Sequence, residues 1–295
     1  MRTLLIWLHQ YGDRYCTIVL TDAARAQRKL PTDGGEETIM LLLGTVPFVA
    51  WLRCDGYDKV EWDEDYNRFV TAMLMALKNA PLDKGNVSNS SVIMSKWVQR
   101  SALNNVLPCV MDDDGLWLEF GVWRGGAMRQ IATKRRNGQV IGFDSFRGLP
   151  EEWRTGYGET FDRRGRVPFP ETKTIKWRVG WFNETLPKFV QANRHRPLRF
   201  VHIDCDLYSS TTVIFHELRD RLAPGVWLTF DELFNYPEYR QHEMRALWEM
   251  LQERRKVYPT LGVEVVSTST HGVDLHERPY EAWYKFQAAS VRLAA

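Results

Sequence analysis

Two groups of acidic residues in this chain each follow a short run of β-branched and aromatic residues. One run ends in Asp204 and Asp206, and the other ends in Asp231 and Glu232. Between them, residues 209–222 have the mixed apolar and charged spacing of a helix. A right-handed strand–helix–strand crossover brings both strand ends to one edge of a parallel sheet, where open α/β sheets bind ligands. Carboxylates gathered there repel one another unless a cation or a proton compensates, so we expect a divalent metal site.

Magnesium is the cation that we expect at Asp204, Asp231 and Glu232, because three carboxylates leave room for water and for substrate oxygens. Such a metal would lower the pKa of a bound hydroxyl and fix it toward an electrophile. Asp206 could act as a base or support a ligand through a hydrogen bond. The alternative for the Asp204-Cys205-Asp206 triplet is that it caps the following helix. The capping interpretation is the weaker one, because the triplet coincides with a second acidic pair, Asp231 and Glu232.

A glycine-rich turn, Gly121–Gly126, follows a strand-like run and opens a helix-like one. Glycines let backbone N–H groups approach a ligand closely, and Trp123 replaces the second glycine of the dinucleotide-binding pattern. Glu119 before the turn suits a ligand with an ammonium group, such as S-adenosylmethionine, and Asp144 at the end of the next strand suits its ribose. The alternatives are a capping or salt-bridged Glu119 and a local turn at Asp144 before Ser145.

Strands that alternate with helices must position these residues. The alternation predicts a doubly wound α/β fold, with a mostly parallel, seven-stranded, Rossmann-like sheet and helices on both faces. The expected strands are 116–120, 140–144, 175–181, the two strands of the crossover, and 263–268 with 286–293 as a closing pair; the expected helices are 127–136, 209–222 and 238–255.

Residues 1–111 are predicted to form a mainly helical N-terminal extension to a domain of residues 112–295. Helical spacing covers Trp62–Lys78 and Ser91–Val106. The apolar window Ile39–Leu52 falls short of the roughly 20 residues that span a bilayer, so we expect a buried or capping segment there.

The composition of the 295 residues is that of a soluble globular protein, with 44% hydrophobic and 26% charged residues and a net charge of +2. This charge gives no reason to expect nucleic acid or a membrane as partner, and it leaves a homo-oligomer open. The four cysteines lack any CxxC spacing, which argues against a zinc site or disulfides and fits a reducing cytoplasm.

The histidines and hydroxyl residues are weaker guides to chemistry. We expect His202 to be a packed, hydrogen-bonded core residue rather than a ligand, since it lies inside a strand. His242 and Glu243 lie in an expected helix and either contact substrate or form a solvated face. The run Ser209–Thr212 is expected to cap the crossover helix, and no Ser-His-Asp spacing surrounds it.

With these residues identified, the chain resembles the macrocin O-methyltransferase (TylF-like) family of class I S-adenosylmethionine-dependent methyltransferases. The similarity covers about residues 112–260 and rests on EFGVWRGG at 119–126, GFDSFRGLP at 142–150, GWFNETLP at 180–187, HIDCDLYSST at 202–211 and FDE at 230–232.

The resemblance implies a role for each matching residue. The cofactor would lie in a cradle made by Glu119, Gly121 and Gly125, with Asp144 on the ribose and with Ser145, Gly180 and Trp181 near the adenosine. It also implies magnesium on Asp204, Asp231 and the following residue, which is Glu232 here and Asp in many members of the family.

The sequence therefore predicts a magnesium-dependent O-methyltransferase that acts on a hydroxyl of a small molecule, such as a sugar of a natural product. Asp204 or Asp206 would accept the proton. A nucleotide-sugar glycosyltransferase, with manganese and a diphosphate at Asp204-Cys205-Asp206, is one alternative. A methyltransferase-like protein without catalytic activity is the other.

Overall fold

The computed structural model describes residues 4–11, 14–20, 62–80, 102–153, 161–234, 236, 238–270 and 287–295. The chain divides between Glu64 and Asp65 into two compact units. In the first unit, the described residues form an antiparallel hairpin of β1 (Leu4–Tyr11) and β2 (Arg14–Leu20). The sequence prediction for this region named helices only, so the hairpin is an addition to it. The apolar window at 39–52 lies outside the described residues.

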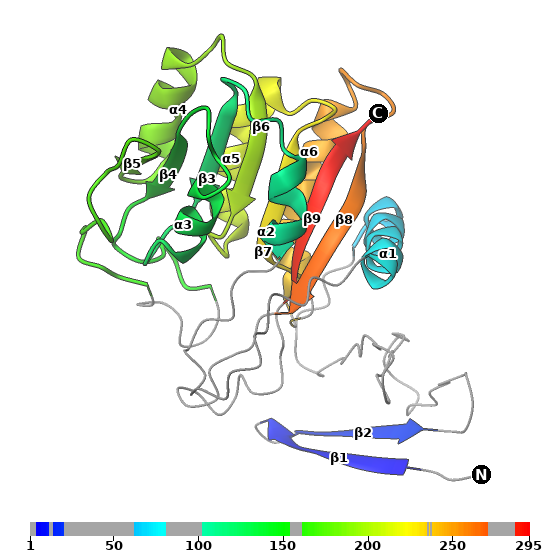
Figure 1. Cartoon of the computed structure of the whole chain (residues 1–295). Helices are drawn as coiled ribbons and strands as arrows, with labels where there is room; N and C mark the ends of the chain where they lie inside the picture. Colours follow the sequence, from blue (N-terminus) through cyan, green and yellow to red (C-terminus); the bar gives the residue numbers. More distant parts are fainter. Residues whose placement is uncertain are drawn as a thin grey trace. The chain divides into compact units, whose positions relative to one another are not determined.

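The second unit is built on a seven-stranded sheet in the order β5-β4-β3-β6-β7-β9-β8 (Figure 1). The first five strands in this order are parallel, and β9 and β8 complete the sheet as an antiparallel pair. This is the predicted doubly wound fold with its predicted closing pair. The strands are β3 (Leu116–Phe120), β4 (Val140–Asp144), β5 (Ile175–Val179), β6 (Leu198–Ile203), β7 (Trp227–Phe234), β8 (Gly262–Thr270) and β9 (Gln287–Ala294).

Helices cover both faces of this sheet, with α2 and α3 in front of it and α5 and α6 behind it in Figure 1. None of the described helices is long and apolar enough to cross a membrane. The helices are α1 (Glu64–Asn79), α2 (Ala102–Val106), α3 (Gly126–Ala132), α4 (Phe182–Ala192), α5 (Tyr208–Leu218) and α6 (Glu243–Arg254), with short 3-10 turns at Leu107–Cys109, Arg219–Arg221 and Tyr239–Gln241.

The core lies on both faces of the central strands. Every residue of β3 is buried, as expected for a strand that helices cover on both sides. Aromatic rings join neighbouring strands, with the Phe120 and Phe143 centroids 4.8 Å apart and those of Trp117 and Phe200 5.7 Å apart. This packing fixes the strand ends, from which the functional residues extend.

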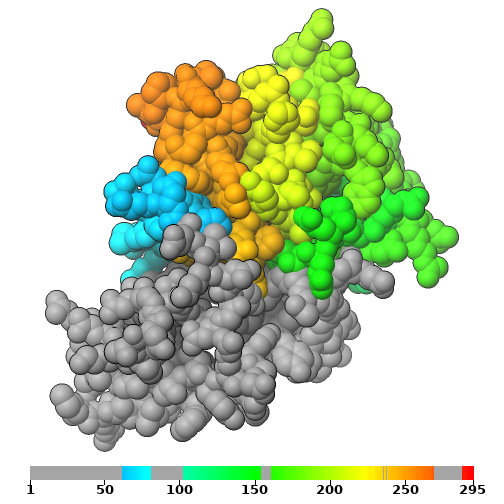
Figure 2. Space-filling model, turned by 180° about the vertical axis from the view of Figure 1, so that it is seen from behind, coloured from blue at the N-terminus to red at the C-terminus, as the bar shows by residue number. Residues whose placement is uncertain are grey.

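Helix α1 confirms the helix predicted at residues 62–78, and it packs on the C-terminal part of the chain (Figure 2). The Tyr66 hydroxyl donates to the Arg240 carbonyl at 2.6 Å, and the Phe69 ring lies 5.0 Å from that of Trp248 on α6. The apolar positions at helical spacing thus face the rest of the second unit, to which α1 belongs from Asp65 onward. A boundary at residue 111 between extension and domain stays a prediction.

Several element ends differ from the prediction. Helix α3 ends at Ala132 and not at residue 136, and α6 begins at Glu243 and not at residue 238. Helix α4 was not predicted, because Pro187 inside it disrupts the helical pattern. Strand β7 continues beyond Asp231 and Glu232 to Phe234, so the second acidic pair lies within the strand and not at its end.

Candidate active site

A cavity of about 570 Å³ opens at the carboxyl ends of β3, β4 and β6, the edge at which such sheets bind ligands. Six of the predicted site residues line it: Gly121, Asp144, Ser145, Trp181, Asp204 and Asp206. The other predicted residues do not line it: Glu119, Gly125, Gly180, Asp231 and Glu232. The cavity therefore lies at the sheet edge predicted from the acidic groups, and of these groups it is Asp204 and Asp206 that line it.

Gly121 is the closest point between β3 and the loop that follows β6. Its φ is +80°, and a Cβ built on it would overlap the backbone carbonyl of Asp204. Its N–H donates to the Phe143 carbonyl of β4 at 3.0 Å. Only a glycine satisfies both the left-handed backbone and this close approach. The turn therefore sets the distance between the glycine loop and the first acid of the predicted metal site.

The Asp144 carboxylate holds the backbone of the glycine loop. Its Oδ2 accepts hydrogen bonds from the N–H groups of Val122 and Trp123, both at 2.8 Å, and its Oδ1 accepts one from Phe146 at 2.6 Å. The local turn given above as the alternative is thus present. An ionised carboxylate has about four acceptor positions, so one remains for a ligand hydroxyl. The ribose role of Asp144 stays a prediction.

Asp144→Asn is expected to lower the free energy of unfolding by about 1–3 kcal/mol, the cost of one buried donor without an acceptor. Whichever way the amide turns, its NH₂ group faces at least one of the three backbone N–H donors. Urea unfolding followed by fluorescence measures the change. Asp162→Asn, at an exposed acid with a local bond to Arg164, is the matched control. A change below about 0.5 kcal/mol at Asp144 would contradict this interpretation.

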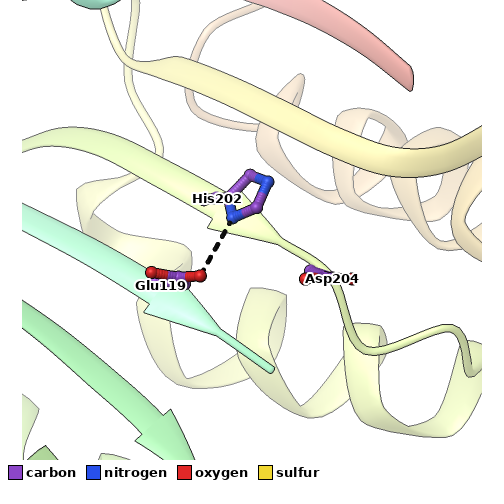
Figure 3. A group of neighbouring side chains, drawn as sticks. All are labelled: Glu119, His202 and Asp204. Atoms are coloured by element: carbon purple, nitrogen blue, oxygen red, sulfur yellow. Dashed lines mark ion pairs between the residues drawn. The ribbon is translucent and has the colours of Figure 1, made fainter. Parts of the chain in front are cut away.

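Glu119 and His202 form a buried pair on the neighbouring strands β3 and β6, where they are register partners (Figure 3). Both side chains are 0% exposed, and His202 Nδ1 lies 3.5 Å from Glu119 Oε1. His202 is therefore buried in the core as expected, but among the described residues neither ring nitrogen has a hydrogen bond, so the expected hydrogen bonding is not found. Glu119 has the salt-bridged position given as its alternative, and its predicted contact with the cofactor ammonium stays a prediction. Asp204 lies just past the end of β6. One of its carboxylate oxygens lies within 4.8 Å of a ligand atom of Glu119 and of a ligand atom of His202.

Carboxylate oxygens of Asp204, Asp206 and Glu232 lie within 4.8 Å of one another. Asp206 has a left-handed backbone (φ +63°) in the loop after β6 and is buried. Burial raises the pKa of Glu232 well above its ordinary range, and the neighbouring acids, Asp231 first among them, raise it further. This set of hard oxygen donors that repel one another suits a divalent cation such as Mg²⁺.

Asp231 lies beside this group without sharing it, although the sequence predicts it as a ligand. It precedes Glu232 on β7, where the register of β7 against β9 shifts between Phe230 and Phe234. Asp206 takes its place in the group of three. The structure thus brings together two of the three predicted ligands and the predicted base.

Two further sequence predictions need correction. The run Ser209–Thr212 does not cap α5, because the helix begins at Tyr208 and these residues lie inside its first turns; the Ser209 hydroxyl bonds to Glu151 instead. Glu243 is 0% exposed, so the solvated-face alternative is wrong for it. Neither a spacing nor a motif pointed to its burial. The aromatic lining by Phe161 and Phe182 was also missed.

Comparison with known proteins matches residues 118–233 to the family model described as "Methyltransferase domain". A curated relative from Streptomyces olivaceus, 8-demethyl-8-(2,3-dimethoxy-alpha-L-rhamnosyl)-tetracenomycin-C 4'-O-methyltransferase, is 31% identical over 39% of this chain and 51% of its own length. The chain thus spans about half the length of that relative.

Similar solved structures include CalS11, a calicheamicin methyltransferase, at 20% identity, with 82% of this chain and 99% of that chain covered and a TM-score of 0.42. The O-methyltransferase NovP is 21% identical, with 66% and 78% covered and a TM-score of 0.37. These similarities are too weak to bear on function. The segment that carries the glycine loop, Asp144 and the acids at the ends of β6 and on β7 thus coincides with residues 118–233, which match the methyltransferase family model.

Proposed function

We propose that this protein is an S-adenosylmethionine-dependent O-methyltransferase that methylates a hydroxyl of a small molecule. A sugar of a natural product is the acceptor class that we favour, because the curated relative is named for methylation at such a sugar. The observation that carries the proposal is one cavity bounded by the glycine loop and Asp144 on one side and by Asp204 and Asp206 on the other. That arrangement suits a methyl donor and a hydroxyl acceptor held side by side.

The cofactor half of the proposed site consists of Gly121, Asp144, Ser145 and Trp181. Backbone N–H groups of the turn and the remaining acceptor position of Asp144 would bind the polar parts of the cofactor. The Trp181 side of the cavity offers an aromatic surface for the adenine. Gly125 has a φ of +72° in the turn after β3, and Gly180 has a φ of +139° in the turn after β5. Both shape their turns without lining the cavity.

The acceptor half of the proposed site consists of Asp204, Asp206 and Glu232. Mg²⁺ bound by these carboxylates would lower the pKa of an acceptor hydroxyl and supply a fixed positive charge. Asp206, buried and lining the cavity, is placed to accept the hydroxyl proton, with Asp204 as the second choice. Methyl transfer is an in-line displacement, so the main task of these side chains is to hold the hydroxyl in position.

Calorimetry with S-adenosylmethionine, followed by turnover on a panel of glycosylated acceptors with and without Mg²⁺, tests the proposal. We expect cofactor binding that needs no metal and turnover that needs it. The assignment would be refuted if no binding is detected at about 1 mM cofactor. A Kd of that size corresponds to a binding free energy of only about −4 kcal/mol. Binding of a nucleotide sugar with Mn²⁺ instead would favour the glycosyltransferase, and cofactor binding without turnover would favour a protein without catalytic activity.

A further inference from the structure

His202 is a buried histidine to which the proposed reaction assigns no task. It lies on β6, its side chain is 0% exposed, and neither ring nitrogen has a hydrogen bond within the described residues. A neutral imidazole has one N–H donor and one acceptor nitrogen, and both lose their hydration when the ring is buried. Burial of such atoms without hydrogen bonds costs free energy, so a compensating contact is expected.

The Glu119 carboxylate lies opposite this ring, because the two residues are register partners on β3 and β6 (Figure 3). Its Oε1 is 3.5 Å from His202 Nδ1, which is longer than the N–H···O hydrogen bonds of about 2.7–3.2 Å in proteins. Two atoms bound to one tetrahedral zinc ion at about 2.0–2.1 Å lie roughly 3.4 Å from each other. The separation therefore suits an ion held between the two side chains better than a direct hydrogen bond.

Asp204 supplies a third donor beside this pair. Ligand atoms of Glu119, His202 and Asp204 all lie within 4.8 Å of one another. The backbone N–H of Asp204 donates to the Phe120 carbonyl at 2.9 Å, which holds the loop after β6 against the end of β3. Asp204 is half-buried and lines the cavity, so an ion can reach the two buried side chains from there.

The mixture of donors decides which cation fits this group. The neighbouring group of Asp204, Asp206 and Glu232 has only carboxylate oxygens, which suit Mg²⁺. An imidazole nitrogen suits Zn²⁺ and related transition-metal ions instead. The group with His202 contains no cysteine, so the cysteine spacing that argues against a cysteine-bound zinc does not bear on it.

We propose that Glu119, His202 and Asp204 form a second cation site, which binds Zn²⁺ through one nitrogen and two oxygens. Three protein ligands leave the fourth position of a tetrahedral zinc to water or to a bound molecule. This inference goes beyond the proposed function and does not depend on it. Two arrangements compete with it: a histidine that only packs in the core, and the cofactor ammonium group predicted to lie at Glu119.

Titration of the untagged full chain with Co²⁺ in excess Mg²⁺ tests the site, because four-coordinate Co²⁺ absorbs visible light strongly and Mg²⁺ competes for the group of three carboxylates. We expect the wild type to bind one equivalent of four-coordinate Co²⁺, which Zn²⁺ displaces. In His202→Leu we expect Co²⁺ affinity to fall by at least about 100-fold, since loss of an outer partner of a ligand already costs about 10–100-fold.

His216→Gln is the matched control. His216 also has a carboxylate neighbour, with its Nε2 3.9 Å from Glu217 Oε1, but its side chain is 67% exposed. This variant should bind Co²⁺ as the wild type does. If His202→Leu does not fold, His202→Gln and Glu119→Gln take its place, and the same direction of change is expected in both.

Absence of the absorption bands in the wild type would overturn the inference, as would wild-type Co²⁺ affinity in the His202 variant or an equal loss in the control. Release of Co²⁺ when S-adenosylhomocysteine saturates the protein would also overturn it, by assigning the space to the cofactor ammonium group. The proposed function fails separately. Wild-type protein that binds Co²⁺ through His202 but not S-adenosylmethionine would refute the methyltransferase assignment and leave this site intact.

Discussion

Asp204→Asn is expected to lower the rate of methyl transfer by about 10³-fold while leaving the affinity for S-adenosylhomocysteine within about threefold. Asp204 is shared by the two groups that could hold a cation, and it lines the cavity. The amide is isosteric but lacks the charge that a hard cation requires. Single-turnover kinetics gives the rate, and calorimetry gives the affinity.

A tenfold or larger loss of cofactor affinity in Asp204→Asn would contradict the division of the cavity into two halves. The matched pair Asp206→Asn and Asp231→Asn then identifies the third ligand. If the group of three in the structure binds the cation, Asp206→Asn weakens Mn²⁺ binding more than Asp231→Asn does. The opposite order would support the ligand set predicted from the sequence, and equal losses would assign both acids to the centre.

Gly121→Ala is expected to lower the free energy of unfolding by about 3 kcal/mol or more. The residue has a left-handed backbone, and its Cβ would meet the backbone of Asp204, which cannot yield as a flexible side chain would. The ends of β3 and β6 must move apart to make room for the Cβ atom of the alanine side chain. Urea denaturation measures the loss.

Gly126→Ala is the control for this change. It lies at the start of α3, where a Cβ meets nothing within 4 Å, and its φ is not positive. Alanine there is expected to be neutral or to stabilise by up to about 1 kcal/mol, because it restricts the unfolded chain. Equal effects of the two substitutions would show that the close approach at Gly121 can relax.

Strands β3 and β4 could be predicted from the sequence to the residue. Strands β3 and β4 begin and end where their apolar runs do, because both faces of each are buried and a glycine or an acid terminates the run. Helix α4 could not be predicted, because Pro187 lies inside it. Proline has no backbone N–H to donate to the helix and is therefore usually taken as a helix breaker. Strand β7 continues through its acids because it also pairs with β9, a partner distant in sequence.

The shared cavity of Gly121, Asp144 and Asp204 could be predicted because neighbouring parallel strands end at one edge. The contact between Glu119 and His202 depends on the register of β3 against β6, which sequence spacing does not reveal. The burial of Glu243 depends on how α6 packs over the sheet after the loop that follows β7. What the sequence lacks is thus the side-chain direction at each strand end, not the identity of the edge.

The three backbone hydrogen bonds of Asp144 have a consequence for how the proposed cofactor would bind. Because they hold the turn after β3 and the turn after β4 in the protein without ligand, the binding surface is formed during folding and not during association. The entropic cost of ordering these turns is then part of the free energy of folding and does not weaken ligand binding. If Asp144 binds the cofactor as we propose, one carboxylate serves both fold stability and cofactor recognition.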